Sequence, residues 1–291
     1  MTNAEVLKVA LAQSAINCRC EPEDFFANEH VVRAQREREG LPAYLDLPRV
    51  CDLVSYGSNV VVCCDEALME PVTSWLSGLE AVHDAFETPE IYRLNELLAP
   101  HGAQVRYQAE YFLPDVDALF AFEPRCTYEL RVLGPEDFHD LYLPAWSNAL
   151  CKERPQLDML GVGAYDGDAL VGLAGCSADC AQMWQIGIDV LPGHRRQGIA
   201  TALTNRLARE TFARGMVPFY CAAWSNVRSV RNALASGFKP AWSRSVPDRW
   251  GRAQSARPPR GAPSKCLSRV VQSNRGHGTP ITIGYLQSIP S

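Results

Sequence analysis

The chain has 291 residues and a formal net charge of −5, with 47% hydrophobic and 21% charged residues. This is the composition of a soluble globular protein, and the length suffices for two domains of ordinary size. No apolar run approaches the ~20 residues of a membrane-spanning helix. Residues 1–10 lack the basic region and apolar stretch of a secretory signal. We therefore expect a cytoplasmic protein with no membrane partner.

Eleven cysteines are numerous enough for disulfides or a zinc site. However, Cys18-x-Cys20, Cys63-Cys64 and Cys176-x3-Cys180 do not form two CxxC pairs, and no His pair completes a ligand set. Several of these residues lie within apolar runs, where a free Cys behaves as a small hydrophobe. We predict reduced, structural thiols and no metal.

Charge is distributed unevenly along the chain. Residues 243–291 carry a net charge of +7, whereas the preceding residues carry −12 and favour cationic ligands through long-range attraction. We predict an α/β domain over 1–126, a second over 127–242 and a basic, mostly disordered tail over 243–291. A basic tail can bind nucleic acid or an acidic partner, but a terminus without function is the preferred interpretation.

In the first segment, apolar runs and alternation predict strands at 51–55, 59–64 and 104–112, and helices at 65–76 and 89–99. Residues 114–124 are predicted to be a connector. In the second segment, strands are predicted at 128–133, 160–165, 169–176, 183–191 and 217–223, and helices at 135–148, 198–214 and 226–236. This order indicates an α/β (α+β) fold.

The loop between the strand at 183–191 and the next helix has the strongest chemical signal. Backbone amides at a helix start can hold a pyrophosphate if no Cβ prevents close approach, and Gly198 and the small Ala200 allow it. Arg195 and Arg196 add positive charge beside the phosphates. The loop is therefore predicted to be a phosphate-binding site.

This loop resembles the signature of the GNAT superfamily of N-acetyltransferases, Gln/Arg-x-x-Gly-x-Gly/Ala, with Arg195, Gly198 and Ala200 at its fixed positions. The run 188–192 before it resembles the family's preceding strand. Asn226-x2-Ser229 and Ser236-Gly237-Phe238 resemble the family's next helix and its exit. The resemblance implies a mixed central sheet flanked by helices. It also implies transfer of an acetyl group from acetyl-CoA, as co-substrate, to a primary amine of a small molecule or protein by direct attack in a ternary complex.

The resemblance also implies roles for individual residues. Backbone groups of Ile188 and Val190 would pair with the pantetheine arm where the sheet splays, and the Val190 amide would polarise the thioester carbonyl. Asn226 and Ser229 would lie near the pantetheine or the sulfur. The pyrophosphate would be held by the loop, comprising Arg195, Arg196, Gln197, Gly198, Ile199 and Ala200.

The sequence gives weaker signals for the general acid and the general base of the reaction. Many family members carry a Tyr acid seven residues after the Asn, but that position is Ala233 here, which leaves water or Tyr220. Asp179 is the preferred base, with Asp189 and Glu153 as alternatives, although Asp189 is expected to point away from the cofactor. Water-relayed or substrate-assisted deprotonation remains an equal alternative.

Three tryptophans and two cysteines each have a functional and a structural interpretation. Trp146, Trp184 and Trp224 are candidates for a substrate wall, although core packing is the more frequent role of Trp. Cys176 and Cys221 are candidate nucleophiles, but buried thiols without a neighbouring His are normally inert.

The first segment resembles the N-terminal half of two-domain bacterial-type GNAT proteins and is compatible with a degenerate copy of the same fold. It lacks the loop motif, so we expect it to cover the sheet and shape the acceptor cleft. A homodimer is also compatible with this architecture. The alternative function is a catalytically weak acyl-CoA sensor or scaffold, favoured by the missing Tyr.

Overall fold

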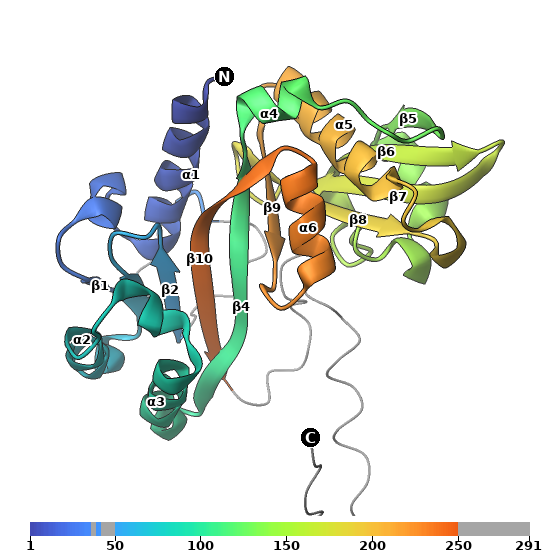
Figure 1. The fold of residues 1–291 in the computed structure, drawn as a ribbon. Helices are drawn as coiled ribbons and strands as arrows, with labels where there is room; N and C mark the ends of the chain where they lie inside the picture. Colours follow the sequence, from blue (N-terminus) through green and yellow to red (C-terminus); the bar gives the residue numbers. More distant parts are fainter. Residues whose placement is uncertain (36–38, 42–49, 250–291) are drawn as a thin grey trace, which may run out of the picture.

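A single ten-stranded mixed sheet organises the computed structural model, which describes residues 1–35, 39–41 and 50–249 (Figure 1). Its order is β1-β3-β2-β10-β4-β9-β8-β7-β6-β5, so β10 lies between strands of the N-terminal segment. The strands are β1 (Val31–Ala34), β2 (Cys51–Ser55), β3 (Val61–Cys64), β4 (Ala103–Pro114), β5 (Glu129–Leu133), β6 (Asp158–Asp166), β7 (Ala169–Ser177), β8 (Met183–Val190), β9 (Val217–Ala222) and β10 (Phe238–Arg249).

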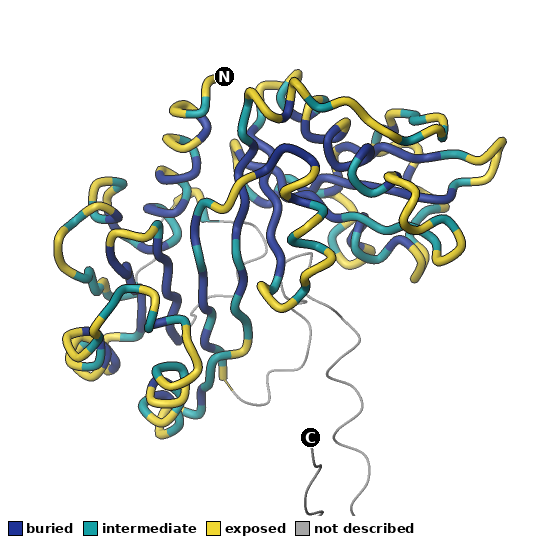
Figure 2. Tube along the Cα trace, in the orientation of Figure 1, coloured by how far each residue is buried: buried dark blue, intermediate teal, exposed yellow. Residues whose placement is uncertain are grey.

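Helices cover both faces of the sheet. One face carries α1, and the other carries α2 and α3 over the N-terminal strands and α5 and α6 over the C-terminal ones. The outer surfaces of the helices are exposed and the central strands are buried (Figure 2). The helices are α1 (Asn3–Cys18), α2 (Met69–Ser77), α3 (Thr88–Leu98), α4 (Val116–Ala121), α5 (Ile199–Ala213) and α6 (Val227–Ala235). In the part of the chain that the structure describes, none is both long and apolar enough to cross a bilayer.

Helix α1 was not predicted from the sequence. It begins with a capping box, in which Thr2 accepts from the Glu5 amide and the Glu5 side chain accepts from the Thr2 amide. It ends at Cys18, and the following residue, Arg19, is its C-cap, with a left-handed φ of 57°. The small and apolar residues lie all around this helix and show no clear 3.6-residue period, so the usual sequence signal of a helix is weak.

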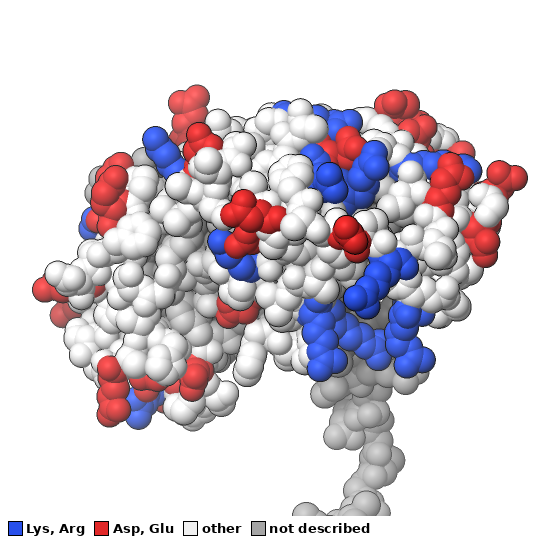
Figure 3. Space-filling model, turned by 45° about the horizontal axis from the view of Figure 1, so that its top comes forward, with Lys and Arg blue, Asp and Glu red and all other residues white. Residues whose placement is uncertain are grey.

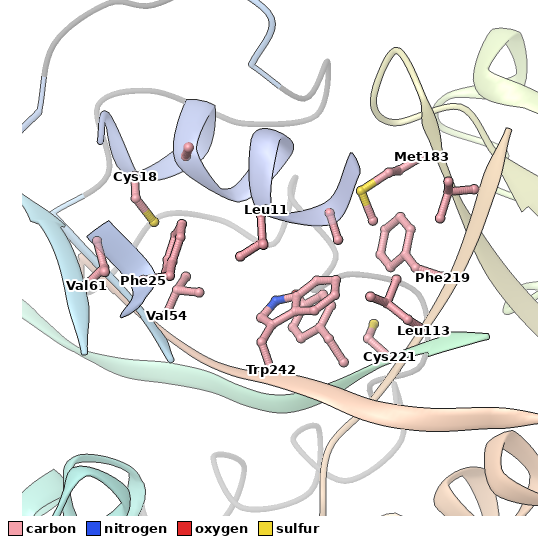
Figure 4. Close-up of a cluster of buried hydrophobic side chains, with 14 of the residues drawn as sticks. Leu11, Cys18, Phe25, Val54, Val61, Leu113, Met183, Phe219, Cys221 and Trp242 are labelled. Carbon is pink, nitrogen blue, oxygen red and sulfur yellow. The ribbon is translucent and has the colours of Figure 1, made fainter. Parts of the chain in front are cut away.

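The core under α1 joins the two predicted domains (Figure 4). Leu11 and Val54 from the N-terminal segment share this cluster with Met183, Phe219 and Trp242. The Trp242 ring stacks on Tyr111 at 4.7 Å and on Tyr56 at 5.4 Å between centroids. The segments on either side of the predicted boundary at 126/127 therefore contribute strands to one sheet and side chains to one core.

Three local predictions were wrong. The helix expected at 135–148 is two 3₁₀ turns, Pro135–Leu141 and Pro144–Trp146, because Pro144 has no amide to continue a helix. The connector expected at 114–124 contains α4, capped by Asp115. The tail expected from 243 is a strand as far as Arg249, paired with β4 on one side and with β2 on the other. The remainder of the predicted tail, 250–291, lies outside the described residues.

Candidate functional site

The sheet opens between β8 and β9. These parallel strands pair only as far as Ile186 and Tyr220, whereas β8 stays paired with β7 up to Val190. The Leu191 amide donates to the Val171 carbonyl at 2.9 Å. Because hydrogen-bonded positions alternate in an antiparallel pair, the backbone groups of Ile188 and Val190 point away from β7. They face the gap left by β9, which pairs with β4 instead.

The loop after β8 turns sharply into α5. Arg196 and Gly198 both adopt left-handed φ angles, of 62° and 78°, and Gly198 is the N-cap of α5. A left-handed conformation costs a residue such as Arg roughly 1–2 kcal/mol. Such turns direct successive amides into one concavity, and the first amides of α5 have no intrahelical acceptor. The loop thus presents backbone donors beside the open end of the gap.

Side chains hold this loop in place. Tyr128, just before β5, donates its hydroxyl to Gln197 Oε1 at 2.9 Å and lies 3.2 Å from His194 Nδ1. Arg195 Nε donates to the Val190 carbonyl at 3.0 Å. No sequence motif connects Tyr128 and His194 to the loop, so neither was predicted to belong to the site. Arg195 and Gln197 therefore stabilise the turn, and the loop amides and Arg196 remain the best placed to meet an anion.

The surface around the loop is basic. Arg195 and Arg196 in the loop and Arg228 and Arg231 on α6 are exposed. Figure 3 shows Lys and Arg side chains gathered on one part of the surface. This charge favours a phosphorylated ligand at the N-terminal end of α5.

A side-chain contact connects α6 to β9 at the apex of the gap, where β8 and β9 separate. Asn226 is its N-cap and accepts from the Ser229 amide at 3.4 Å. Ser229 Oγ lies 2.7 Å from the hydroxyl of Tyr220, whose pKa is raised by burial. Ala233 is fully buried in the core under α5. The phenol at the apex of the gap is therefore on β9, at the last residue paired with β8, and not on α6.

The two predicted aspartates are engaged in structural contacts. Asp179 is buried, and its Oδ1 accepts from Arg154 Nη1 at 2.8 Å and Ser177 Oγ at 3.0 Å. It follows the end of β7 that pairs with Gln185, at the opposite end of β8 from Val190. This placement and its ion pair disfavour Asp179 as a base.

Asp189 points away from the gap, on the strand face that the alternation predicts. It accepts from the amides of Asn148 and Ala149 at 2.8 and 3.0 Å and from Asn148 Nδ2 at 2.6 Å. Burial nevertheless raises the pKa of Asp189. Glu153 is exposed, and its Oε2 accepts from Cys151 Sγ at 3.6 Å.

The candidate tryptophans and cysteines differ in how far they are buried. Trp146 and Trp184 are core residues, whereas Trp224 is 73% exposed. Burial raises the pKa of Cys221 to about 12, and Gln185 Nε2 donates to its sulfur at 3.1 Å. Cys176 lies beside the Thr211 hydroxyl. None of the ten cysteines in the described ranges forms a disulfide, and eight of them are buried.

A mixed sheet that opens beside a basic helix N-terminus defines an α/β protein whose geometry suits an extended, phosphorylated ligand. Residues 118–238 match the family model described as the acetyltransferase (GNAT) family, and this region is a domain of that family. No curated protein matches the chain.

Solved structures with similar folds are distant. A GCN5-related N-acetyltransferase from Kribbella flavida is 16% identical over 86% of this chain and 97% of that chain, with a TM-score of 0.45. An acetyltransferase from the GNAT family of Colwellia psychrerythraea is 17% identical over 56% of this chain and 63% of that one, with a TM-score of 0.40. A GCN5-related N-acetyltransferase-like protein from Streptococcus suis is 14% identical over 55% of this chain and 68% of that chain, also with a TM-score of 0.40. The chain thus spans about two thirds of the length of the latter two structures.

Proposed function

We propose that the protein transfers the acetyl group of acetyl-CoA to a primary amine of a small molecule or protein, by direct attack in a ternary complex. The observation that carries this proposal is the junction of the β8–β9 gap with the left-handed turn at Arg196 and Gly198. An extended arm fits the gap as an additional strand, and a pyrophosphate fits the amides at the start of α5. Acetyl-CoA joins these two chemical features in one molecule.

The residues suit this ligand. At Gly198 an added Cβ would lie 3.7 Å from the Arg125 backbone, so there is room for a methyl group but the φ of 78° favours glycine. The amides of residues 196–200 would hold the pyrophosphate, with Arg195 and Gln197 fixing the turn. Ile188 and Val190 would pair with the pantetheine arm. Asn226 and Ser229, at the start of α6, would lie near the pantetheine arm or the sulfur.

The chemistry requires a neutral amine, a polarised thioester and a proton for the departing thiolate. The Val190 amide, which faces the gap, would donate to the thioester carbonyl. Tyr220 lies at the last paired position of β9, at the apex of the gap, and its hydroxyl, whose pKa burial raises, carries a proton at neutral pH. We assign Tyr220 the role of proton donor that the missing Tyr at Ala233 would otherwise fill.

The alternative is an acyl-CoA-binding sensor with little turnover. It is favoured by Ala233 and by the ion pair that engages Asp179. Calorimetric titration with acetyl-CoA, combined with detection of released CoA thiol over a panel of amines, separates the two functions. Binding with thiol release supports the enzyme, binding without release on any amine supports the sensor, and absence of binding contradicts both.

A further inference from the structure

A pocket of ≈ 430 Å³ lies over β4 and β10, outside the phosphate-binding loop. One wall is the segment before α3, with His83, Phe86 and Glu87, and the opposite wall is Trp224, just before α6. Figure 1 shows α3 and α6 flanking the paired strands β10 and β4. The volume falls in the range of small-molecule sites.

Glu110 is the charged group on the floor of this pocket. It accepts a hydrogen bond from Ser243 Oγ at 2.9 Å, and burial raises its pKa. The guanidinium of Arg244, which also lines the pocket, forms an ion pair with Asp52. Glu110 and Glu87 therefore give the pocket a negative character, which favours a cation.

Two aromatic side chains, Trp224 and Phe86, contribute to the remaining lining. Trp224 is 73% exposed, the largest exposed fraction among the large hydrophobic side chains of the described residues. Phe86 also lines the pocket, whereas Tyr56 and Trp242 border it with their rings stacked on each other in the core under α1. An apolar or aromatic ligand body would remove this surface from water, and a cation would interact favourably with the ring faces.

The pocket adjoins the gap through β9. Glu110 is the cross-strand partner of Ala222, two residues beyond Tyr220, where β9 has left β8. Paired residues of antiparallel strands share a sheet face, so Glu110 and Ala222 lie on the face that carries α6. Trp224 follows two residues later. The end of β9 thus separates the phosphate-binding side from a negatively charged, aromatic pocket.

We propose that this pocket binds the acceptor, a cationic primary amine on an apolar or aromatic body, with Glu110 receiving the ammonium group. The proposal rests on the proposed acetyl transfer. The Glu110 carboxylate takes one proton from the ammonium, and the nitrogen lone pair forms the N–C bond with the acetyl carbon. The C–S bond breaks, a second nitrogen proton passes to the thiolate through Tyr220, and Glu110 releases its proton to solvent. The products are the amide and free CoA.

The test measures thiol release from acetyl-CoA with 2-phenylethylamine, spermidine, kanamycin and glutamate. We expect the highest kcat/KM with 2-phenylethylamine and the lowest with glutamate. Glu110→Gln should raise the KM for 2-phenylethylamine about 10- to 100-fold, because a charge-assisted hydrogen bond is lost. Glu110→Asp should restore part of the activity. Trp224→Ala should raise the same KM about 3- to 10-fold.

Matched controls are exposed residues outside the pocket. Glu70→Gln on α2 and Tyr92→Ala on α3 should leave KM and kcat/KM for the amines unchanged. The affinity for acetyl-CoA should be the same in every variant. Amine turnover that is insensitive to both Glu110→Gln and Trp224→Ala, or a preference for glutamate, would overturn the pocket assignment while acetyl transfer stands.

Failure of the proposed function gives a different pattern. If acetyl-CoA binds but no amine is acetylated, titration of the CoA-bound protein with 2-phenylethylamine tests the pocket alone. Binding that is lost in Glu110→Gln would support the amine site, and absence of binding would reject it.

Discussion

The guanidinium of Arg244 on β10 lies against the carboxylate of Asp52 on β2, although the two residues are 192 positions apart. Arg244 Nε donates to Asp52 Oδ1 at 2.8 Å, and both side chains are only 5% exposed. This buried pair attaches the last strand of the sheet to the N-terminal segment.

Removing one partner of this pair should strongly destabilise the protein. Asp52→Ala leaves the Arg244 charge buried without its carboxylate, which typically costs about 3–5 kcal/mol. Urea unfolding measures the loss. The control is Asp65→Ala, which removes an exposed pair with Arg249 on the same strand and should cost less than about 1 kcal/mol. Equal effects of the two changes would contradict the buried arrangement.

The end of β10 should contribute to stability. We expect a chain ending at Trp242 to unfold at a lower temperature than one ending at Arg249, because residues 243–249 pair with β4 and the first three of them also with β2. Comparing these two chains isolates the seven residues. Indistinguishable melting temperatures would mean that this part of the strand is dispensable.

Substitution of Gly198 should weaken acetyl-CoA binding more than the same substitution at a comparable glycine outside the site. Gly198→Ala places a Cβ on a residue with φ of 78°, where the left-handed conformation costs about 1–2 kcal/mol, and it distorts the amides at the start of α5. Calorimetry should show weaker acetyl-CoA binding. Gly215→Ala, at the other end of α5 with φ of 75°, is the matched control and should lose similar stability with unchanged affinity. A similar loss of affinity in both variants would assign the effect to folding alone.

Tyr220 should affect turnover rather than binding. Tyr220→Phe removes the proposed proton donor and should lower kcat about 100-fold, the usual scale of general-acid catalysis. Tyr107→Phe, which loses a hydroxyl that donates to Cys221 Sγ, is the control and should retain kcat. If kcat is the same in both variants, water supplies the proton.

The carboxyl of Glu110 should make stability depend on pH. Burial raises its pKa in the folded protein above the unfolded value, so its favourable contribution is complete below the unfolded pKa and is lost as pH rises through the folded pKa. Glu110→Gln should therefore raise the melting temperature at pH 7 and have little effect at pH 4. The exposed Glu70→Gln should show no such pH-dependent difference.

The sequence by itself determined the local features of the site. The strand and helix around residues 183–214 were predicted nearly to their ends, because apolar periodicity and glycine positions specify backbone conformation within a few residues. The loop motif at 195–200 resembles one family, and the structure places left-handed residues at Arg196 and Gly198, within that motif.

Only the tertiary structure decided what these elements meet. The insertion of β10 between β2 and β4, the ion pair that holds Asp179 and the pocket between Phe86 and Trp224 each join residues far apart in the chain. No local pattern specifies such contacts, because strand pairing and charge pairing depend on the packing of the whole sheet. The strand at 243–249 was missed for this reason: its polar, proline-containing sequence becomes a strand only where β2 and β4 supply its partners.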